Sequence, residues 1–311
     1  MKKKDQTVRR GPINPFLDWG FKYMFGREET KETLIGFLNL LLNPDVSIIN
    51  IRYLNAELLG DSPDLKRCVV DVLATDDEGN RYLVEMQNAT NMNIRERLVY
   101  YSCRLVDQMG QHSQDWQYGQ IRRVYAICLM NFTYEPNSTL RDDVILRSRR
   151  DGRIFSDILN IITLQIPNLQ VKSLTECRES YEILLFLLTQ MSRNMRTTEE
   201  LLAEIDALSC FPEETKEIFR RVVKTDIATL SEKEWQIYEI ERDYYLRKIG
   251  EIRTGREEGR KAGLEEGRAE GRAEGRAEEK QRIAKVMMEH GVALETIYTC
   301  TGLTEDELKR L

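Results

Sequence analysis

Two carboxylates, Asp71 and Glu85, are the side chains of this 311-residue sequence best suited to chemistry, because each stands in an otherwise apolar run. Val69–Thr75 and Arg81–Gln87 are rich in β-branched and apolar residues. The sequence Asp-Asp-Glu-Gly between the two runs favours a tight turn, since its glycine tolerates a positive φ. We therefore predict a β-hairpin that carries one of the two carboxylates on each strand.

The predicted register of the hairpin sets these carboxylates opposite each other. A loop in which Asp76 faces Asn80 places Asp71 opposite Glu85 on one face. The remaining predicted pairs are Val69 with Gln87 on the same face and, on a wholly apolar second face, Val70 with Met86, Val72 with Val84 and Ala74 with Tyr82. A slip of one residue would mix the two faces, so the pattern itself supports this register.

Like charges at directly opposed positions destabilise a hairpin, so we expect something to compensate them. A hard divalent cation such as Mg²⁺ or Mn²⁺ would do so, because it binds through one or two carboxylates together with water and phosphate oxygens. Alternatively, the pair lies at a solvated sheet edge and has no function. The residues of the hairpin alone leave both interpretations open.

The composition predicts a globular, cytoplasmic protein. Charged residues make up 32% and hydrophobic residues 41% of the chain, and no apolar run is long enough to span a membrane or to form a secretory leader. The formal net charge of −6 argues against bulk attraction to nucleic acid but leaves room for a local basic groove. Residues 1–13 contain a basic segment, and we expect them to form a disordered tail.

Histidine and cysteine usage narrows the chemistry further. The chain has two histidines, His112 and His290, which excludes multi-histidine metal sites and leaves few bases for a Ser-His-Asp or Cys-His site. The cysteines are scattered without a Cys-x-x-Cys pair and are interpreted as reduced thiols: Cys68, Cys103, Cys128, Cys177, Cys210 and Cys300. If the protein is an enzyme, its chemistry is therefore expected to rest on carboxylates.

The patterns around the hairpin predict an α/β fold with a mixed central β-sheet flanked by helices. An aromatic-rich segment is expected to pack Phe16, Phe21 and Phe25 into the core. Further elements are predicted at Glu28–Leu42 (buried helix), Val46–Glu57 (strand), Asn93–Met109 (amphipathic helix), Arg122–Asn131 (central buried strand) and Ile154–Leu164 (strand), the last following a charged segment at Arg141–Arg153.

The second half of the chain is predicted to be helical. Residues 171–250 are interpreted as a helical subdomain, and residues 251–280 as a Gly-Arg-Ala-Glu repeat that forms a marginal helix, because each glycine weakens it. The glycine row would let another helix approach closely, which favours self-association, but a solvated spacer explains it equally well. Residues 281–311 are predicted to form three short helices, and their acidic residues favour a protein-contact module over a DNA-reading helix-turn-helix.

Several of these segments together resemble the recombination-promoting nuclease and putative transposase family, a branch of the PD-(D/E)XK nucleases. They are NPFLDWGFKYMFG, VVDVLATDDEGNRYLVEMQ, the helix with Tyr100 and Arg104, RRVYAICLMN and the Gly-Arg-Glu repeat. The resemblance runs from residue 14 to about residue 280 and implies a restriction-endonuclease-like core at residues 14–170.

The resemblance also implies roles for individual residues. Asp71 and Glu85 match the metal-binding acidic pair, and Gln87 takes the position of the motif's lysine, so the implied catalytic set is Asp71, Glu85 and Gln87 with Mg²⁺ or Mn²⁺. Arg97, Tyr100 and Arg104 on the following helix are implied phosphate contacts, although Arg104 stands where a lysine is expected and Arg on a helix is more often solvated surface. Glu57 has no firm match and is held as a third acidic candidate.

The implied function is a Mg²⁺-dependent DNA endonuclease linked to recombination or transposition. Its expected partners are DNA and further copies of the same chain, joined through the repeat and the C-terminal helices. The alternative is a catalytically weak or inactive protein that keeps the nuclease fold and acts in DNA binding or as an oligomeric assembly module.

Overall fold

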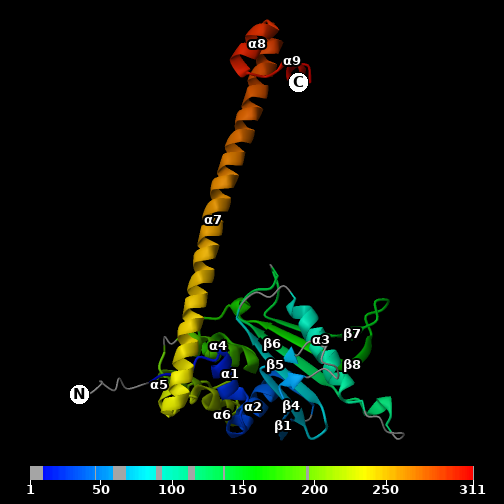
Figure 1. Cartoon of the computed structure of the whole chain (residues 1–311), viewed down its shortest axis with the longest axis vertical. Helices are drawn as coiled ribbons and strands as arrows, with labels where there is room; N and C mark the ends of the chain where they lie inside the picture. Colours follow the sequence, from blue (N-terminus) through cyan, green and yellow to red (C-terminus); the bar gives the residue numbers. More distant parts are fainter. Residues whose placement is uncertain are drawn as a thin grey trace, which may run out of the picture. The chain divides into compact units, whose positions relative to one another are not determined.

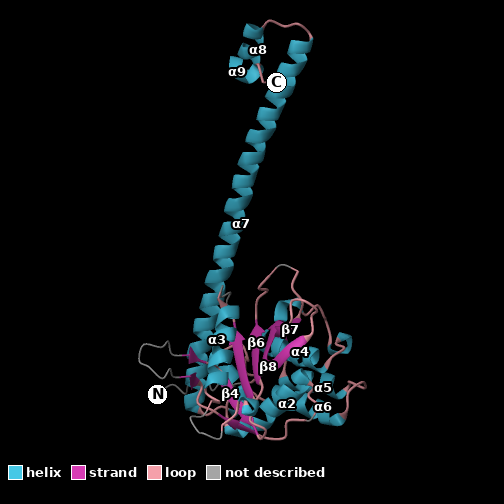
Figure 2. Ribbon diagram, turned by 90° about the vertical axis from the view of Figure 1, so that its right-hand side faces the viewer, coloured by secondary structure: helices cyan, strands magenta, loops and turns pink. Residues whose placement is uncertain are grey.

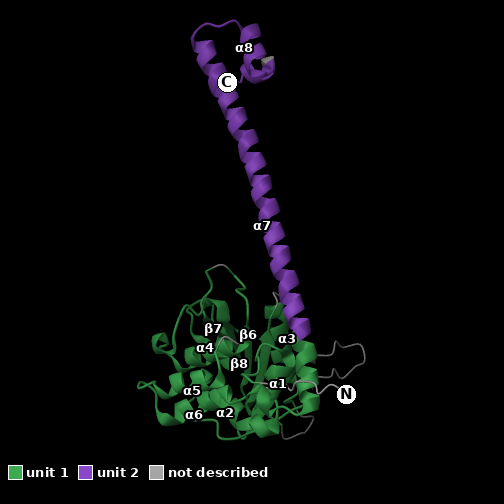
Figure 3. Cartoon of the chain, turned by 90° about the vertical axis from the view of Figure 1, so that its left-hand side faces the viewer, with its two compact units in different colours: residues 1–242 green, residues 243–311 purple. Residues whose placement is uncertain are grey.

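The computed structural model describes residues 10–45, 47–58, 68–88, 93–110, 116–135, 137–193 and 196–310 (Figure 1). Within these residues all strands precede residue 166, and helices make up the regular structure that follows (Figure 2). The chain divides into two compact units, residues 1–242 and residues 243–311 (Figure 3). The predicted α/β class with a mixed sheet and helical C-terminal segments is confirmed.

A six-stranded mixed sheet forms the centre of the first unit, with the strand order β1-β4-β5-β6-β8-β7. Strands β5, β6 and β8 are parallel, and the remaining pairs are antiparallel. A separate two-stranded sheet pairs β2 with β3. The strands are β1 (Ile51–Tyr53), β2 (Glu57–Leu58), β3 (Cys68–Val69), β4 (Val72–Asp76), β5 (Arg81–Gln87), β6 (Val124–Met130), β7 (Arg141–Arg147) and β8 (Ile154–Gln165).

The degree of burial explains which strands could be predicted from the sequence and which could not. Strand β6, predicted as central, is buried along almost its whole length, because helices cover both faces of the sheet there. Strand β7 was not predicted: Arg141–Arg147 lies at the sheet edge, is largely exposed, and keeps the charged sequence that an edge strand tolerates. The single strand predicted at Val46–Glu57 is wrong in its extent: β1 covers Ile51–Tyr53, Glu57 begins the separate strand β2, and Val46 lies outside the described residues.

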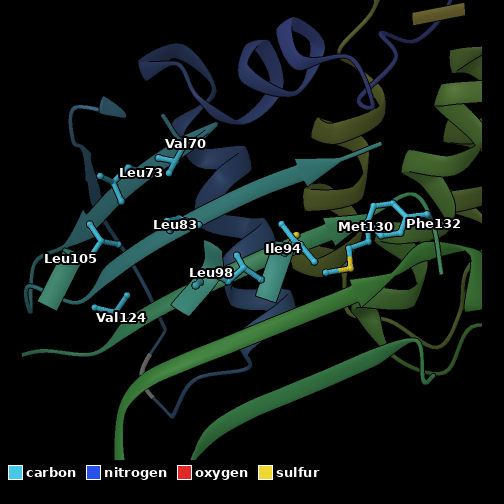
Figure 4. Close-up of a cluster of buried hydrophobic side chains, with 11 residues drawn as sticks. Val70, Leu73, Leu83, Ile94, Leu98, Leu105, Val124, Met130 and Phe132 are labelled. Carbon is cyan, nitrogen blue, oxygen red and sulfur yellow. The ribbon is translucent and has the colours of Figure 1, made fainter. Parts of the chain in front are cut away.

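One face of the sheet is covered by helix α3 (Ile94–Asp107), and the other by a helical layer that includes α2 (Lys31–Leu42) and α4 (Ser180–Arg193) (Figures 1 and 2). Helix α6 (Glu213–Val223) packs on α2 and α4. Figure 4 shows the cluster beneath α3, where Ile94, Leu98 and Leu105 from the helix meet Leu83 and Val124 from the sheet. Their spacing of four and seven residues is that of one helix face, as the sequence predicted.

The N-terminal aromatic segment is buried as predicted. Phe21 and Phe25 lie in helix α1 (Asp18–Phe25), and both are fully buried, as is Phe16 just before it. Gly20 lies so close to the carbonyl oxygen of Asn14 that no side chain fits there. The hydroxyl of Tyr238 accepts a hydrogen bond from the Asn14 amide at 3.1 Å, which ties this segment to a helix more than two hundred residues later.

The hairpin of β4 and β5 has the predicted register over its inner half only. Val72 pairs with Val84 and Ala74 with Tyr82, and the Asp76 amide donates to the Asn80 carbonyl as expected. The ladder ends at Val72, however.

The predicted pairing of Val69 with Gln87 is wrong, because Val69 pairs with Glu57 of β2. Val70, expected on the second face with Val72, instead packs in the cluster under α3. Asp71 therefore lies in a bend rather than opposite Glu85 in a ladder.

Helix α7 (Glu232–Glu289) contains the whole glycine repeat in one uninterrupted helix of 58 residues. The second unit ends with α8 (Leu294–Thr301) and α9 (Glu305–Leu308), which pack with the end of α7 around Ala284, Ile297 and Leu308. Gly291 ends the preceding helix with a φ of 74°, and Thr304 exchanges capping bonds with Glu307, both as predicted.

The helical segment at residues 171–250 comprises α4, α5 (Thr198–Asp206), α6 and the start of α7. The boundaries proposed at residues 170, 250 and 280 remain predictions. Among the described residues, no helix has a stretch sufficiently long and apolar to cross a membrane.

Candidate active site

Glu85 is the most deeply buried carboxylate of the candidate site, with 2% of its surface exposed. It lies on β5 under α3, beside Cys128 of the parallel neighbour β6. Its Oε2 accepts hydrogen bonds from Gln87 Nε2 at 2.9 Å and from Arg97 at 3.2 Å. Its Oε1 is buried and has no hydrogen-bond partner among the described residues.

Asp71 approaches Glu85 from the bend before β4. Its Oδ2 accepts a hydrogen bond from the Met86 amide at 2.8 Å. If the ladder had continued, that amide would have donated to the backbone carbonyl of Val70, its predicted partner. The carboxylate thus replaces the missing ladder bond and is held next to the strand that carries Glu85. Its side chain keeps 15% of its surface exposed, so the pair is reached from the Asp71 side.

Burial makes both acids hard to ionise. Loss of hydration, followed by repulsion from Asp71, raises the pKa of Glu85 to about 8, against the smaller opposing effects of Arg97 and Gln87. Loss of hydration also raises the pKa of Asp71 to about 6, with a further contribution from Asp18 and an opposing hydrogen bond from the Met86 amide. Perturbed acids of this kind gather at functional sites, because structure alone gains nothing from them.

The acidic pair fits a divalent cation. The unpartnered Glu85 Oε1 is a buried acceptor that costs stability unless something donates to it or coordinates it, and Asp71 lies beside it with an exposed edge. No group of three or more His, Cys, Asp or Glu side chains in the described ranges is arranged as a metal site. Two carboxylates with water and phosphate oxygens completing the shell is the arrangement that Mg²⁺ favours.

The three candidate phosphate contacts on α3 have different partners in the structure. Arg97 contacts Glu85 directly and lies over the ring of Tyr101 at 5.5 Å. Arg104 lies two turns further along the helix and pairs with Asp107 at 3.9 Å, away from Glu85. Tyr100 is 40% exposed and its ring packs against that of Tyr101. Of the proposed phosphate contacts, the structure brings Arg97 to the carboxylates.

Sequence reasoning missed two charged residues beside the site, Asp18 and Lys22 of α1. The Lys22 ammonium lies 2.7 Å from Asp18 Oδ1 and 3.7 Å from Asp71 Oδ1. Both residues stand in the aromatic-rich segment that we interpreted as core packing, and that interpretation is correct for its phenylalanines. The available signal was an Asp–Lys pair four residues apart on the polar side of a buried helix.

The remaining residues considered in the sequence analysis are Gln87, Glu57 and the two histidines. Gln87 uses its amide to hold Glu85, as described above. The backbone of Glu57 pairs with Val69, two residues before Asp71, and its side chain lies outside the described part of the structure. His290 is exposed in the second unit, where its Nδ1 lies 2.8 Å from the Val286 carbonyl oxygen, and His112 lies outside the described residues.

Two family models match the chain. The model described as "PD-(D/E)XK nuclease family transposase" matches residues 15–255. The model described as "Rpn/YhgA-like nuclease family, C-terminal HTH domain" matches residues 277–311, which favours the helix-turn-helix interpretation that the sequence analysis ranked second. Searches of curated proteins and of solved structures find no match.

Proposed function

Because the chain belongs to the PD-(D/E)XK nuclease family of transposases, we propose that it is a Mg²⁺-dependent DNA endonuclease whose acidic pair is Asp71 and Glu85. One observation carries the proposal: a buried glutamate on β5 has an unpartnered carboxylate oxygen next to a second, partly exposed carboxylate. A protein core gains nothing from such a pair, whereas a nuclease needs one.

Asp71 and Glu85 are the residues that would hold the cation. When bound, Mg²⁺ supplies a water of lowered pKa and positive charge for the phosphate. Gln87 and Arg97 fix the Glu85 carboxylate from two sides, so that Oε1 is left for coordination. The Met86 amide does the same for Asp71, whose Oδ2 it binds.

The proposed reaction is hydrolysis of one phosphodiester bond. A water oxygen forms a new bond to phosphorus, the bond between phosphorus and one deoxyribose oxygen breaks, and that oxygen takes up a proton from solvent while the attacking water loses one. The products are a phosphomonoester and a free hydroxyl. No oxidant, reductant or covalent enzyme intermediate is required.

A nicking assay on supercoiled plasmid with Mg²⁺ tests the proposal. Wild-type protein is expected to convert supercoiled into open-circular DNA, and Asp71→Ala and Glu85→Ala are expected to reduce the rate at least about 100-fold, by the loss of cation binding. Asp143→Ala, a carboxylate on the exposed edge strand, is the matched control and should cleave like wild type.

Circular dichroism shows whether each variant is folded. Unchanged cleavage by either Asp71→Ala or Glu85→Ala would contradict the site, and absence of cleavage by folded wild-type protein would contradict the enzyme.

A second candidate function is favoured by the match at residues 277–311. We propose that the C-terminal helix-turn-helix domain binds DNA and that the glycine repeat joins copies of the chain. If the repeat is the assembly element, truncation after Gly250 lowers the oligomeric state measured by light scattering. An unchanged oligomer would show that the repeat does not mediate assembly. If the full-length protein is a nuclease-fold protein with weak catalysis, it would bind DNA without nicking the plasmid.

A further inference from the structure

The candidate site has no lysine where the family motif places one. Gln87 occupies that position, and its amide is used to bind Glu85 Oε2 at 2.9 Å. A neutral amide cannot offset the charge that develops on a phosphate during hydrolysis, because that needs a cation or a charged donor. The proposed nuclease therefore lacks one positive charge on β5.

Arg97 does not replace that charge. It binds Glu85 Oε2 at 3.2 Å, and only 28% of its side chain is exposed. A guanidinium committed to a nearly buried carboxylate acts as its counter-ion, and moving it to a substrate would leave Glu85 buried without compensation. Arg95 pairs with Glu135 at 2.7 Å and lies over the ring of Tyr134, which holds it on another side of α3.

Lys22 has the charge, the position and the freedom that the site lacks. Its ammonium lies 3.7 Å from Asp71 Oδ1, and it is close enough to Glu85 to act on that carboxylate electrostatically. Its main partner is Asp18, one turn earlier on α1, whose side chain is 59% exposed. An ion pair this exposed is weak, because water screens both charges, so a phosphate can displace Asp18 at little cost.

The packing of helix α1 fixes the backbone position of Lys22. The Trp19 amide donates to the Glu241 carboxylate at 3.0 Å, and Phe21 and Phe25 of the same helix are fully buried. The backbone of Lys22 is thus fixed by the core, while 39% of its side chain stays exposed at the Asp71 edge. A flexible four-carbon stem on a fixed backbone suits a donor that must reach a phosphate.

We propose that Lys22 of α1 is a catalytic residue that contacts the scissile phosphate and supplies the positive charge absent at Gln87. This inference rests on the proposed endonuclease function. The ammonium acts as a fixed charge and hydrogen-bond donor, and no proton passes from it to the substrate. The motif lysine is thereby replaced by one from a different element, which lies beside Asp71, whereas Arg97 binds Glu85.

Single-turnover cleavage of plasmid at saturating protein, with Mg²⁺, tests this proposal. Lys22→Met is expected to lower the rate about 100-fold, the usual loss when one donor to a developing oxyanion is removed. Lys22→Met combined with Gln87→Lys is expected to recover at least tenfold of that loss, because the second change restores a cation at the motif position. Lys31→Met is the matched control and should cleave like wild type, since Lys31, like Lys22, pairs with an exposed carboxylate one turn earlier in the chain, here that of Glu28 at 3.2 Å.

Two further measurements separate catalysis from binding and from folding. DNA affinity in Ca²⁺, measured by fluorescence anisotropy, should change less than threefold in Lys22→Met. Without DNA, this variant should bind Mg²⁺ at least about threefold more tightly in a thermal-shift titration, because a cation next to Asp71 is removed.

A Lys22→Met variant that cleaves at the wild-type rate, or a double variant without recovery, would overturn the role of Lys22. A loss of DNA affinity as large as the loss of cleavage rate would also overturn it, because Lys22 would then contribute to DNA binding and not to the cleavage step. Wild-type protein that never cleaves contradicts the proposed function instead, and in that case an unchanged Mg²⁺ affinity in Lys22→Met would show that the ammonium does not face the acidic pair.

Discussion

The acidic site and the glycine repeat use the same residue types in opposite environments. At the site, Glu85 and Arg97 form a pair whose carboxylate is 3% exposed. In the repeat, residues 246–283 are all exposed, and pairs such as Arg253 with Glu257 at 3.2 Å stand in water. Charge density in the sequence therefore says little about chemistry, and loss of hydration is what distinguishes the two regions.

The difference shows why only one region is a candidate for catalysis. In water, a glutamate and an arginine gain little from each other, because solvent screens their charges. Under α3, the same two groups lose hydration, and the Glu85 carboxyl has a strongly raised pKa. A site that is unfavourable without a cation is one that a cation stabilises when it binds.

Leucine substitutions give the largest contrast between the two regions. Leu83→Ala removes a fully buried side chain beneath α3 and is expected to cost about 3 kcal/mol of unfolding free energy, through lost burial and the cavity that remains. Leu264→Ala, in the repeat and 52% exposed, should change it by less than about 0.5 kcal/mol. Urea unfolding of the full chain followed by far-UV circular dichroism measures both. Equal effects would mean that the repeat is buried against a partner.

The stability of the metal-free protein should fall as the pH rises. The folded-state pKa values of Glu85 and Asp71, about 8 and about 6, lie above their ordinary values, so the folded state binds more protons than the unfolded state in this range. Each group can lower the unfolding free energy by at most about 1.4 kcal/mol per pH unit, between its unfolded and folded pKa values. Glu85→Gln should remove most of the fall above pH 6.

Tryptophan fluorescence in urea follows this effect, with chelator present. Glu274→Gln in the exposed repeat is the matched control and should leave the pH profile unchanged. Adding Mg²⁺ should flatten the wild-type profile at alkaline pH, because a bound cation favours both ionised carboxylates. A profile that is identical in wild type and Glu85→Gln would show that Glu85 does not titrate in this range.

Glycine-to-alanine substitutions should change stability in opposite directions in the folded core and in the repeat. Gly20→Ala should cost about 2 kcal/mol, because a side chain there collides with the Asn14 carbonyl in the core. Gly263→Ala should instead stabilise α7 by about 0.8–1.0 kcal/mol, since a methyl group there meets nothing. Hydrogen exchange of the amides around each position measures both changes. A destabilising Gly263→Ala with a smaller oligomer in light scattering would show that the glycine row packs against another helix.

The smallest effects are expected for exposed ion pairs, in whichever region they lie. Glu257→Gln in the repeat and Asp157→Asn, which removes the partner of Arg123, should each change the unfolding free energy by less than about 1 kcal/mol. Similar small values in both regions would show that burial, not location in the chain, decides the contrast. A large effect of Asp157→Asn would instead indicate a role for that carboxylate beyond its exposed pair.

Much of the fold around the site was predictable because local patterns there agree with tertiary packing. The alternation in β4 and β5 fixed the register of their inner half, and the apolar run of β6 identified the central strand. Strand β7 escaped because its exposed edge position allows a charged sequence. The break at Asp71 escaped because the competing partner of Val69 is the short strand β2, which no local pattern marks.

The sequence pointed to the acidic residues of the candidate site, but it did not show which basic side chains lie beside them. Asp71 and Glu85 stand out as carboxylates in apolar runs, but which charges approach them depends on how distant elements pack. Arg97 reaches Glu85 because α3 lies over β5, whereas Arg104 on the same helix pairs with Asp107. Lys22 reaches Asp71 from the start of the chain.

The sequence by itself determined the hairpin, the acidic pair and the glutamine at the motif position, because these depend on residues close together in the chain. Only the tertiary structure decided that Glu85 keeps one oxygen without a partner and that Lys22 lies beside Asp71. The physical reason is that hydration and charge at a site are set by everything that packs around it. Here those groups come from β5 and α3, which are neighbours in the chain, and from α1, which lies near its start.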